Sequence, residues 1–239
     1  DALGQSKPPF FRVLKSSVDS FEQIKGRVSW IKFGLYIANY IINLEVSVPI
    51  YFFLDLLFIF MWLIYPKIDS KFKCFVYNFL ILILIFLASL RGGFTSDYDN
   101  YVKLFNIFKD YSFKEVILHG LYGYPELGYL LWQFIVSRLT NSTIALFTSC
   151  SVLIVLAHGG TIKKYSDDVI LGLFLFLEVG NFYASFNIMR QIMAASISLF
   201  GTRYLIDRKL RSYLFVVFLA SSFHKTALVL IPVYFVVYS

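Results

Sequence analysis

Residues 74–90 have the sequence CFVYNFLILILIFLASL, and no charged side chain interrupts this run before Arg91. The hydrocarbon core of a bilayer is crossed by about 20 predominantly apolar helical residues, within a range of roughly 17 to 25. A helix is also the form in which a single crossing segment satisfies its own backbone hydrogen bonds. The stretch therefore predicts a transmembrane helix.

The composition of the whole chain agrees with this prediction. Of its 239 residues, 58% are hydrophobic and 15% are charged, whereas soluble domains have roughly 45–50% and about 25%. These values exclude a soluble globular domain, a disordered chain, a collagen-like fibre and a disulfide-stapled secreted module. The net charge of +7 comes from bases in short clusters between apolar runs, as in the cytoplasmic loops of membrane proteins. We therefore expect no nucleic-acid partner.

Other apolar runs extend the prediction to an all-α polytopic membrane protein with at least six transmembrane helices. The predicted spans are residues 46–65, 74–90, 142–158, 169–183, 188–206 and 213–238. The fourth is interrupted by Glu178 and Gly180. The sixth either crosses once with tilt or breaks near His224 and Pro232.

The orientation follows from the basic residues of the short loops. Bases follow the first, third and fifth of the six predicted spans, and all three loops alternate correctly if they are cytoplasmic. These bases are Lys67, Lys71 and Lys73, then Lys163 and Lys164, then Arg208, Lys209 and Arg211. The long segment 91–141 and the turn 181–187 are then predicted to face outward.

The two ends of the sequence raise separate expectations. Residues 1–45 are predicted to be a basic N-terminal extension to a membrane domain over 46–239. Within the extension, residues 28–44 form either a marginal span, which we favour slightly, or an interfacial helix. Since residues 236–239 end inside an apolar run, we expect the membrane domain to continue beyond them.

The outward segment is predicted to carry amphipathic interfacial helices. Tyr98, Tyr101, Val102, Phe105 and Phe108 fall on one helical face, which suits a helix lying on the membrane surface. The apolar stretch 130–139 is too short to span. Glu126, which precedes it, either favours a helix N-terminus or places a carboxylate where water and lipid headgroups meet.

Several ionisable residues lie within the predicted spans, where they are costly and usually face a bundle interior or a wet cavity. Arg190 and Gln191 stand just inside the outer end of the fifth span, and the guanidinium suits bidentate phosphate binding. The alternative for Arg190 is snorkelling to the headgroups. His224 is either a structural residue or part of a wet cavity. Asp55 and Glu178 are either proton-relay groups or buried and protonated.

No metal or nucleotide chemistry is predicted. Cys74 and Cys150 have no partner at metal-ligand spacing. Dinucleotide-binding, P-loop and zinc-peptidase motifs are absent from the sequence. We therefore expect neither a metal nor a cofactor.

Five short motifs in this order resemble the EpsG/Wzy family of bacterial polysaccharide polymerases, over about residue 46 to the end. They are Arg91, Asp97-Tyr98-x-x-Tyr101, Glu126-x-Gly128-Tyr129, Arg190-Gln191-x-x-Ala194 and Phe223-His224-x-Thr226-Ala227. The resemblance implies a multi-pass protein of the bacterial plasma (inner) membrane. It implies a metal-independent glycosyltransferase that joins polyprenyl-diphosphate-linked oligosaccharide repeat units on the outer side, making exopolysaccharide, capsule or O-antigen. Membrane lipid, a flippase and a chain-length regulator are the other implied partners.

The resemblance also suggests roles for individual residues. The predicted catalytic residues are Glu126, His224 and Asp97, and the predicted substrate-binding residues are Arg91, Arg190, Gln191, Tyr98 and Tyr101. The two arginines would bind the diphosphate, and one of the three catalytic candidates would take the proton of the attacking hydroxyl.

Two other function classes remain open. A flippase or transporter of lipid-linked sugars would also place charges inside the bundle, although inverted repeats are expected there and none is visible. A membrane acyltransferase that modifies polysaccharide would use His224 as its base. The length of the polymer in a deletion strain distinguishes the three classes.

Overall fold

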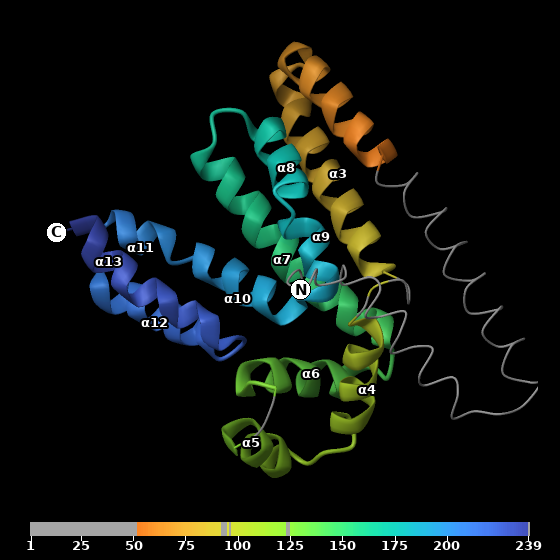
Figure 1. Ribbon diagram of the computed structural model, residues 1–239. Coiled ribbons are helices and arrows are strands. Elements are labelled where there is room, and N and C mark those ends of the chain that lie inside the picture. The colour runs from red at the N-terminus through yellow and green to blue at the C-terminus, as the bar shows by residue number, and fades with distance from the viewer. Residues whose placement is uncertain (1–51, 92–94, 96, 123–124, 239) are drawn as a thin grey trace, which may run out of the picture. The chain divides into compact units, whose positions relative to one another are not determined.

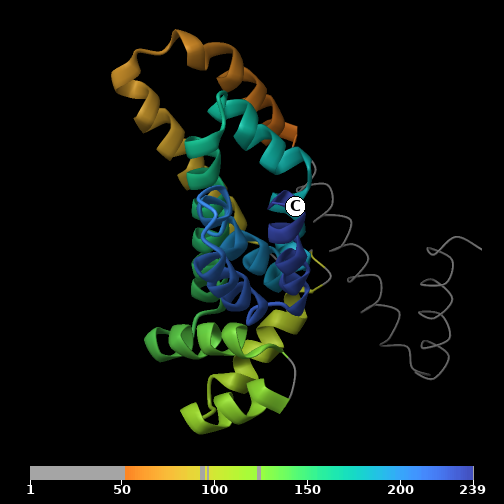
Figure 2. The same ribbon diagram turned by 90° about the vertical axis from the view of Figure 1, so that its left-hand side faces the viewer.

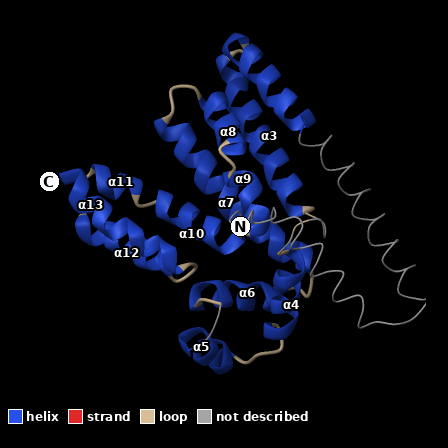
Figure 3. Cartoon of the chain, in the orientation of Figure 1, coloured by secondary structure: helices blue, strands red, loops and turns tan. Residues whose placement is uncertain are grey.

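Helix is the only regular secondary structure in the part of the chain that the structure describes (Figure 3). This computed structural model describes residues 52–91, 95, 97–122 and 125–238, which belong to one compact unit, Phe52–Ser239. The predictions for the extension 1–45 and for a span or interfacial helix at 28–44 lie outside these residues. The predicted all-α fold is confirmed for the described part.

The described elements begin with helical residues 52–64 and the short 3-10 helix η1 (Tyr65–Lys67). The helices that follow are α3 (Ser70–Ser89), α4 (Tyr98–Phe108), α5 (Phe113–Tyr122), α6 (Leu127–Leu139), α7 (Thr143–Tyr165), α8 (Val169–Glu178) and α9 (Asn181–Asn187). The chain ends with α10 (Met189–Leu199), α11 (Thr202–Ile206), α12 (Leu210–Ser221), the 3-10 helix η2 (Lys225–Leu230) and α13 (Ile231–Tyr238) (Figure 1).

Three described segments are long and apolar enough to cross a membrane: Ser70–Ser89, Thr143–Tyr165 and Val169–Asn187. They correspond to the second, third and fourth predicted spans. The prediction of a membrane protein is therefore supported, whereas the predicted number of six spans is not confirmed. The last of these segments breaks between α8 and α9, where Gly180 has a φ of 92°, a backbone conformation that glycine adopts without penalty. The expected interruption at Glu178 and Gly180 is confirmed.

The fifth and sixth predicted spans are each divided. The fifth breaks at Phe200 and Gly201, whose N–H groups bond to carbonyls only three residues back. Gly201 is buried, and a Cβ there would lie 3.0 Å from the carbonyl oxygen of Ser198 and 3.4 Å from the Tyr213 ring of α12. The sixth ends its first helix at Ser221 and becomes extended at His224, the second of the two alternatives considered. None of the resulting helices reaches the length of a span.

Helix α3 has one face buried against α7 and an opposite face that is exposed and apolar. Residues spaced three or four apart form its buried stripe, which packs against α7; they are Tyr77, Leu80, Ile81, Leu84 and Ala88. The opposite face exposes Phe75, Phe79, Leu82 and Phe86, each more than half accessible. A helix with apolar residues on both faces is buried or lies in lipid. The four exposed apolar side chains therefore indicate a lipid-facing surface.

The segment between α3 and α7 folds into a layer of three helices, α4 to α6. Phe108, Val116 and Leu130 form its buried core. Tyr101, Phe105 and Phe108 share one face of α4 as predicted, but this face is buried against protein, and the predicted position of the helix on the membrane surface is not confirmed. The layer contacts the N-terminal half of α7 through the Tyr98 ring on Phe147 at 5.1 Å. Figure 2 shows the layer at one end of the described unit, beyond α7 and α10.

Candidate functional site

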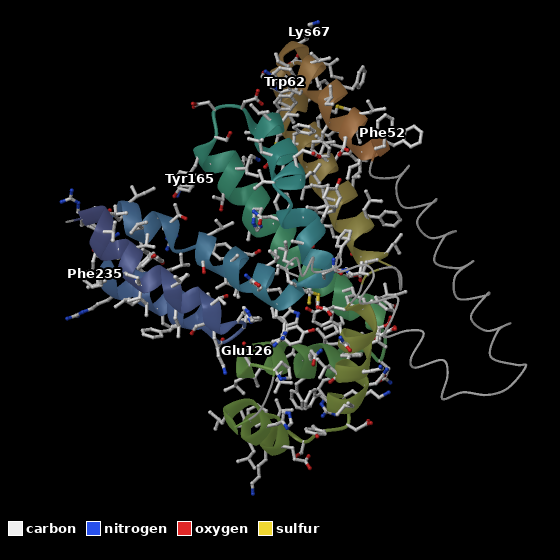
Figure 4. All side chains as sticks on the ribbon, in the orientation of Figure 1. Phe52, Trp62, Lys67, Glu126, Tyr165 and Phe235 are labelled. Atoms are coloured by element: carbon white, nitrogen blue, oxygen red, sulfur yellow. The ribbon has the colours of Figure 1, made fainter. Side chains whose placement is uncertain are left out.

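Glu126 is the residue immediately before α6, at its N-cap position. Its extended backbone (φ −61°, ψ 147°) turns the carboxylate away from the helix, and the helix N-terminus receives no side-chain cap from it. The side chain is only 9% exposed. Figure 4 shows Glu126 beside the first turn of α10 and the turn that follows α12. A buried carboxylate requires charged or hydrogen-bonding partners, and both neighbouring segments supply them.

Arg190 is the first of these partners. Its Nη1 donates to Glu126 Oε2 at 2.5 Å, and the two side chains are 10% and 9% exposed. The arginine stands in the first turn of α10 and points into the bundle, so snorkelling to headgroups does not describe its position. A charge-assisted bond of this kind is short and strong, and it joins two motifs that the sequence places far apart.

The turn after α12 supplies the second and third partners. His224 Nδ1 lies 3.1 Å from Glu126 Oε1, at ion-pair distance but outside hydrogen-bond geometry. The backbone N–H of Lys225 donates to the same oxygen at 3.4 Å. Both carboxylate oxygens are therefore engaged. We call Glu126, Arg190 and His224 the Glu126 cluster.

A glycine brings the two halves of the cluster together. The N–H of Gly128 donates to the carbonyl of Ser222 at 2.7 Å. A Cβ at position 128 would lie 2.2 Å from Ser222 Oγ and 2.7 Å from its carbonyl oxygen, so only glycine allows this approach. The start of α6 and the turn before His224 are consequently held in backbone contact.

Two tyrosines lie behind the cluster. The Tyr129 ring is fully buried, and the Arg190 guanidinium carbon stands 5.9 Å from its centroid. Tyr101 packs edge-on against Tyr129 at 6.2 Å and donates to the carbonyl of Asn187 at 2.9 Å. Burial raises the pKa of the Tyr101 phenol, an effect that the positive charge of Arg190 opposes. Tyr101 therefore remains a neutral phenol beside the cluster at neutral pH.

Arg91 has a different environment from the one predicted for a diphosphate ligand. It is 3% exposed, and its guanidinium donates to the carbonyls of Ala88 and Ser185 at 2.8 and 2.6 Å and to Ser151 Oγ at 2.9 Å. The rings of Phe147 and Phe186 flank it at 5.2 and 5.0 Å. These contacts tie α3, α7 and α9 together. Substrate binding by Arg91 stays a prediction, and its contacts favour a structural role.

The other predicted site residues lie around the cluster rather than in it. Asp97 is partly buried ahead of α4 and accepts from Asn100 at 3.5 Å. Tyr98 stacks on α7, as described above, and Gln191 is exposed beside Arg190. Their predicted roles remain untested.

The two carboxylates without an identified partner prove to be paired with each other. Asp55 and Glu178 share a side-chain hydrogen bond, and the Tyr183 hydroxyl donates to Asp55 at 3.4 Å. A hydrogen bond between two carboxyl groups requires one proton between them. Glu178 is exposed and Asp55 is partly buried within the protein, so the alternative of two buried carboxyl groups is not supported, and a proton-relay role stays a prediction.

Sequence reasoning missed two polar residues of α6 that support the site. Tyr129 belongs to a motif that gives it no role of its own, and Gln133 lies outside all five motifs. Gln133 is 1% exposed and donates to the Tyr129 hydroxyl at 3.1 Å. A lone amide four residues after a tyrosine in an apolar helix is the signal that could have found this pair.

Metal-ligating side chains do not gather in the described part of the chain, where no group of three or more His, Cys, Asp or Glu residues is positioned to hold a metal ion. The Glu126 cluster contains one carboxylate, which faces two cationic or potentially cationic side chains.

Comparison with known proteins supports the resemblance found from the motifs. The family model for the EpsG family matches residues 74–239, a region that includes all three members of the Glu126 cluster. No curated protein and no solved structure matches the chain. Because the matched region covers more than half of the sequence, the chain belongs to the EpsG family, the EpsG/Wzy-like polysaccharide polymerases.

Proposed function

We propose that this protein is a multi-pass polysaccharide polymerase of the bacterial plasma membrane. It would be a glycosyltransferase that joins polyprenyl-diphosphate-linked oligosaccharide repeat units on the outer side, without a metal or a cofactor. The observation that carries this proposal is the Glu126 cluster, in which one carboxylate contacts both Arg190 and His224 within the region shared with the family.

The reaction makes two demands on the site. A hydroxyl oxygen of the acceptor sugar forms a bond to the anomeric carbon of the donor, and the bond from that carbon to the diphosphate oxygen breaks. The hydroxyl proton must pass to a base, and the departing polyprenyl diphosphate takes the bonding electron pair. A base and a cation are therefore needed near one another.

The geometry favours His224 as the base. Both oxygens of Glu126 are already engaged, so the carboxylate is better placed to orient His224 than to accept a proton itself. Nδ1 lies on the side of Glu126, so the imidazole would use Nε2 for the acceptor hydroxyl, and a small rotation of the ring would let Nδ1–H donate to the carboxylate as in Ser-His-Asp triads. His224 is also the most accessible member of the cluster, at 24% against 9% for Glu126 and 10% for Arg190.

Arg190 is proposed to stabilise the diphosphate. Its guanidinium is planar and presents several donors, of which Nη1 contacts Glu126. The same side chain also interacts with the Tyr101 hydroxyl. A planar guanidinium with several donors binds phosphate oxygens better than Lys does, and a diphosphate at this position would compete with Glu126 and Tyr101 for these donors. Tyr98, Tyr101 and Gln191 are proposed to guide lipid and sugar toward the cluster from α4 and α10, since aromatic faces suit both.

The position of the cluster supports the outer side. The α4–α6 layer meets α7 in its N-terminal half, where Trp132 donates to Ser149 at 2.9 Å. The opposite end of α7 carries Lys163 and Lys164, which the positive-inside rule places in the cytoplasm. Figure 4 shows Lys67 at one end of the described unit and Glu126 far from it, beside the α4–α6 layer.

The test is the surface polysaccharide of a deletion strain, separated on a gel after complementation with the complete gene. The polymerase proposal expects single repeat units in the deletion strain and a restored ladder with the wild-type gene. Arg190→Ala and His224→Gln should not restore the ladder, whereas the matched control His119→Gln, in α5 and outside the cluster, should. Loss of all surface product would instead indicate a flippase, and full-length chains lacking a modification would indicate an acyltransferase.

A further inference from the structure

A cavity of about 710 Å³ lies between α7, α12 and the junction of α10 with α11. It is reached from the C-terminal halves of α7 and α10, whereas the Glu126 cluster lies at the first turn of α10. The volume falls within the range of about 300–1,000 Å³ that is typical of small-molecule sites. The cavity is therefore separate from the proposed polymerase site and large enough for part of a ligand.

The lining of this cavity has an apolar part and a basic part. Leu199, Phe215 and Val216 belong to the apolar part. Three cationic side chains contribute the basic part, Lys164 from α7, Arg203 from α11 and Arg211 from α12, and the described lining contains no carboxylate. An apolar wall beside an unbalanced positive charge suits an amphipathic anion.

Two of these cations are held by aromatic rings rather than by acids. The Arg203 guanidinium carbon lies 4.4 Å from the centroid of Tyr204, whose hydroxyl also accepts from it. The Lys164 ammonium lies 4.9 Å from the centroid of Tyr165. A ring face attracts a cation without neutralising its charge, so both groups remain able to bind an anion.

An adjoining cavity of about 440 Å³ shares these four residues. Its lining adds Asp207, which is paired with Lys209 at 3.2 Å. The carboxylate that lines this adjoining cavity therefore already has a cation of its own, and it does not neutralise Lys164 or Arg203.

We propose that the 710 Å³ cavity is a binding site for an anionic glycerophospholipid. The phosphate would lie among Lys164, Arg203 and Arg211, and an acyl chain would lie along the apolar wall. The basic loops on this side are predicted to be cytoplasmic, and basic pockets between helices on that side suit the headgroups of anionic lipids. The proposal does not depend on the polymerase reaction, because it concerns a different end of α10.

Gly160 provides a way to close the cavity without disturbing the helix packing. It lines the cavity, and a Cβ built on it meets nothing within 4 Å. Its neighbour Gly159 instead packs against α3, where a Cβ would lie 2.4 Å from Ile81 Cδ1. Gly160→Leu therefore adds an apolar side chain to the cavity and leaves the three cations in place.

The experiment titrates the purified complete protein in detergent with phosphatidylglycerol, and counts bound lipid by native mass spectrometry. The wild type should bind phosphatidylglycerol about tenfold more tightly than phosphatidylcholine. Removal of two of the cations should abolish this difference. Lys164→Gln/Arg203→Gln tests the charge and Gly160→Leu tests the space. Lys67→Gln/Lys71→Gln, two exposed lysines outside the cavity, is the matched control and should bind as the wild type does. Thermal unfolding verifies that every variant is folded.

Three results would overturn the proposal. Equal binding of phosphatidylcholine would show that the cations do not select the ligand. Binding of glycerol phosphate as tight as that of phosphatidylglycerol would show that the apolar wall contributes nothing and that a free phosphate is the ligand. Undiminished binding by folded Gly160→Leu would place the lipid elsewhere, as expected if another protein segment fills the cavity.

Discussion

Replacing Gly128 by Ala pushes apart the two segments that hold the Glu126 cluster without substituting any of its three residues. Gly128 follows Glu126 by two residues, and Ser222 precedes His224 by two. The hydrogen bond from Gly128 to the Ser222 carbonyl, at 2.7 Å, is therefore the backbone link between the carboxylate and the imidazole. A methyl group at position 128 acts directly on this link.

The size of the displacement follows from the distances around Gly128. The new Cβ would lie 2.2 Å from Ser222 Oγ, which can rotate away, and 2.7 Å from the Ser222 carbonyl oxygen, which cannot. Ordinary contact begins at 3.4 Å, so the carbonyl must recede by about 0.7 Å. A misplacement of about 1 Å in a catalytic arrangement costs about a hundredfold in rate. We expect polymerisation to slow by roughly 10- to 100-fold and the protein to lose about 1–3 kcal/mol of stability through overpacking.

The assay is the initial rate at which the purified complete protein extends a lipid-linked repeat unit, measured at a temperature where circular dichroism shows each variant folded. Gly160→Ala is the matched control, since its Cβ meets nothing within 4 Å and its rate should equal that of the wild type. A folded Gly128→Ala protein with the wild-type rate would refute the argument that this contact assembles the cluster.

Four further predictions concern the cluster, the packing and the ion requirement. His224→Gln should slow polymerisation by about 10²–10⁴-fold. The double variant His224→Gln/Glu126→Gln should be only slightly slower than His224→Gln, because the two residues act as a unit. Single-turnover rates in which the two losses add would contradict this. Arg91→Lys should lower the free energy of unfolding by about 2–4 kcal/mol, since an ammonium leaves some of the buried acceptors unsatisfied. If the Arg91→Lys protein had the wild-type melting temperature but made no polymer ladder, Arg91 would instead act on the substrate. In thermal melts, Gly160→Ala should stabilise by up to about 1 kcal/mol through its higher helix propensity, whereas Gly159→Ala should stabilise less, because its Cβ would displace the Ile81 Cδ1 methyl; equal stabilisation by the two variants would contradict this contact. EDTA should leave the polymerisation rate unchanged, and restoration of a lost rate by a divalent cation would show that a metal takes part.

The elements that sequence reasoning predicted well are those governed by local pattern. An uninterrupted apolar run specifies a membrane helix whatever its neighbours are, and α3 and α7 follow this rule. The break between α8 and α9 was also visible, because Gly180 adopts a φ of 92° that a side chain would oppose. The amphipathic period of α4 likewise predicted its buried face.

The predicted fifth span was less successful because hydropathy does not report where a helix must bend, and for the sixth span the sequence left a single crossing and a break near His224 both open. The fifth is divided where Gly201 packs close to the Tyr213 ring, and the sixth where His224 turns toward Glu126. Both breaks are stabilised by contacts with distant segments. A window of hydropathy averages over such positions and sees one continuous apolar stretch.

The sequence by itself determined that this is an α-helical membrane protein of the EpsG family, since composition, apolar runs and ordered motifs are properties of the chain alone. Only the tertiary structure decided which of the motif residues meet. It brings Glu126, Arg190 and His224 together, encloses Arg91 among Ala88, Ser185 and Ser151, and pairs Asp55 with Glu178. The physical reason is that a buried charge must find its partner through the packing of helices, and that packing depends on close approaches such as the one at Gly128, which no linear spacing reveals.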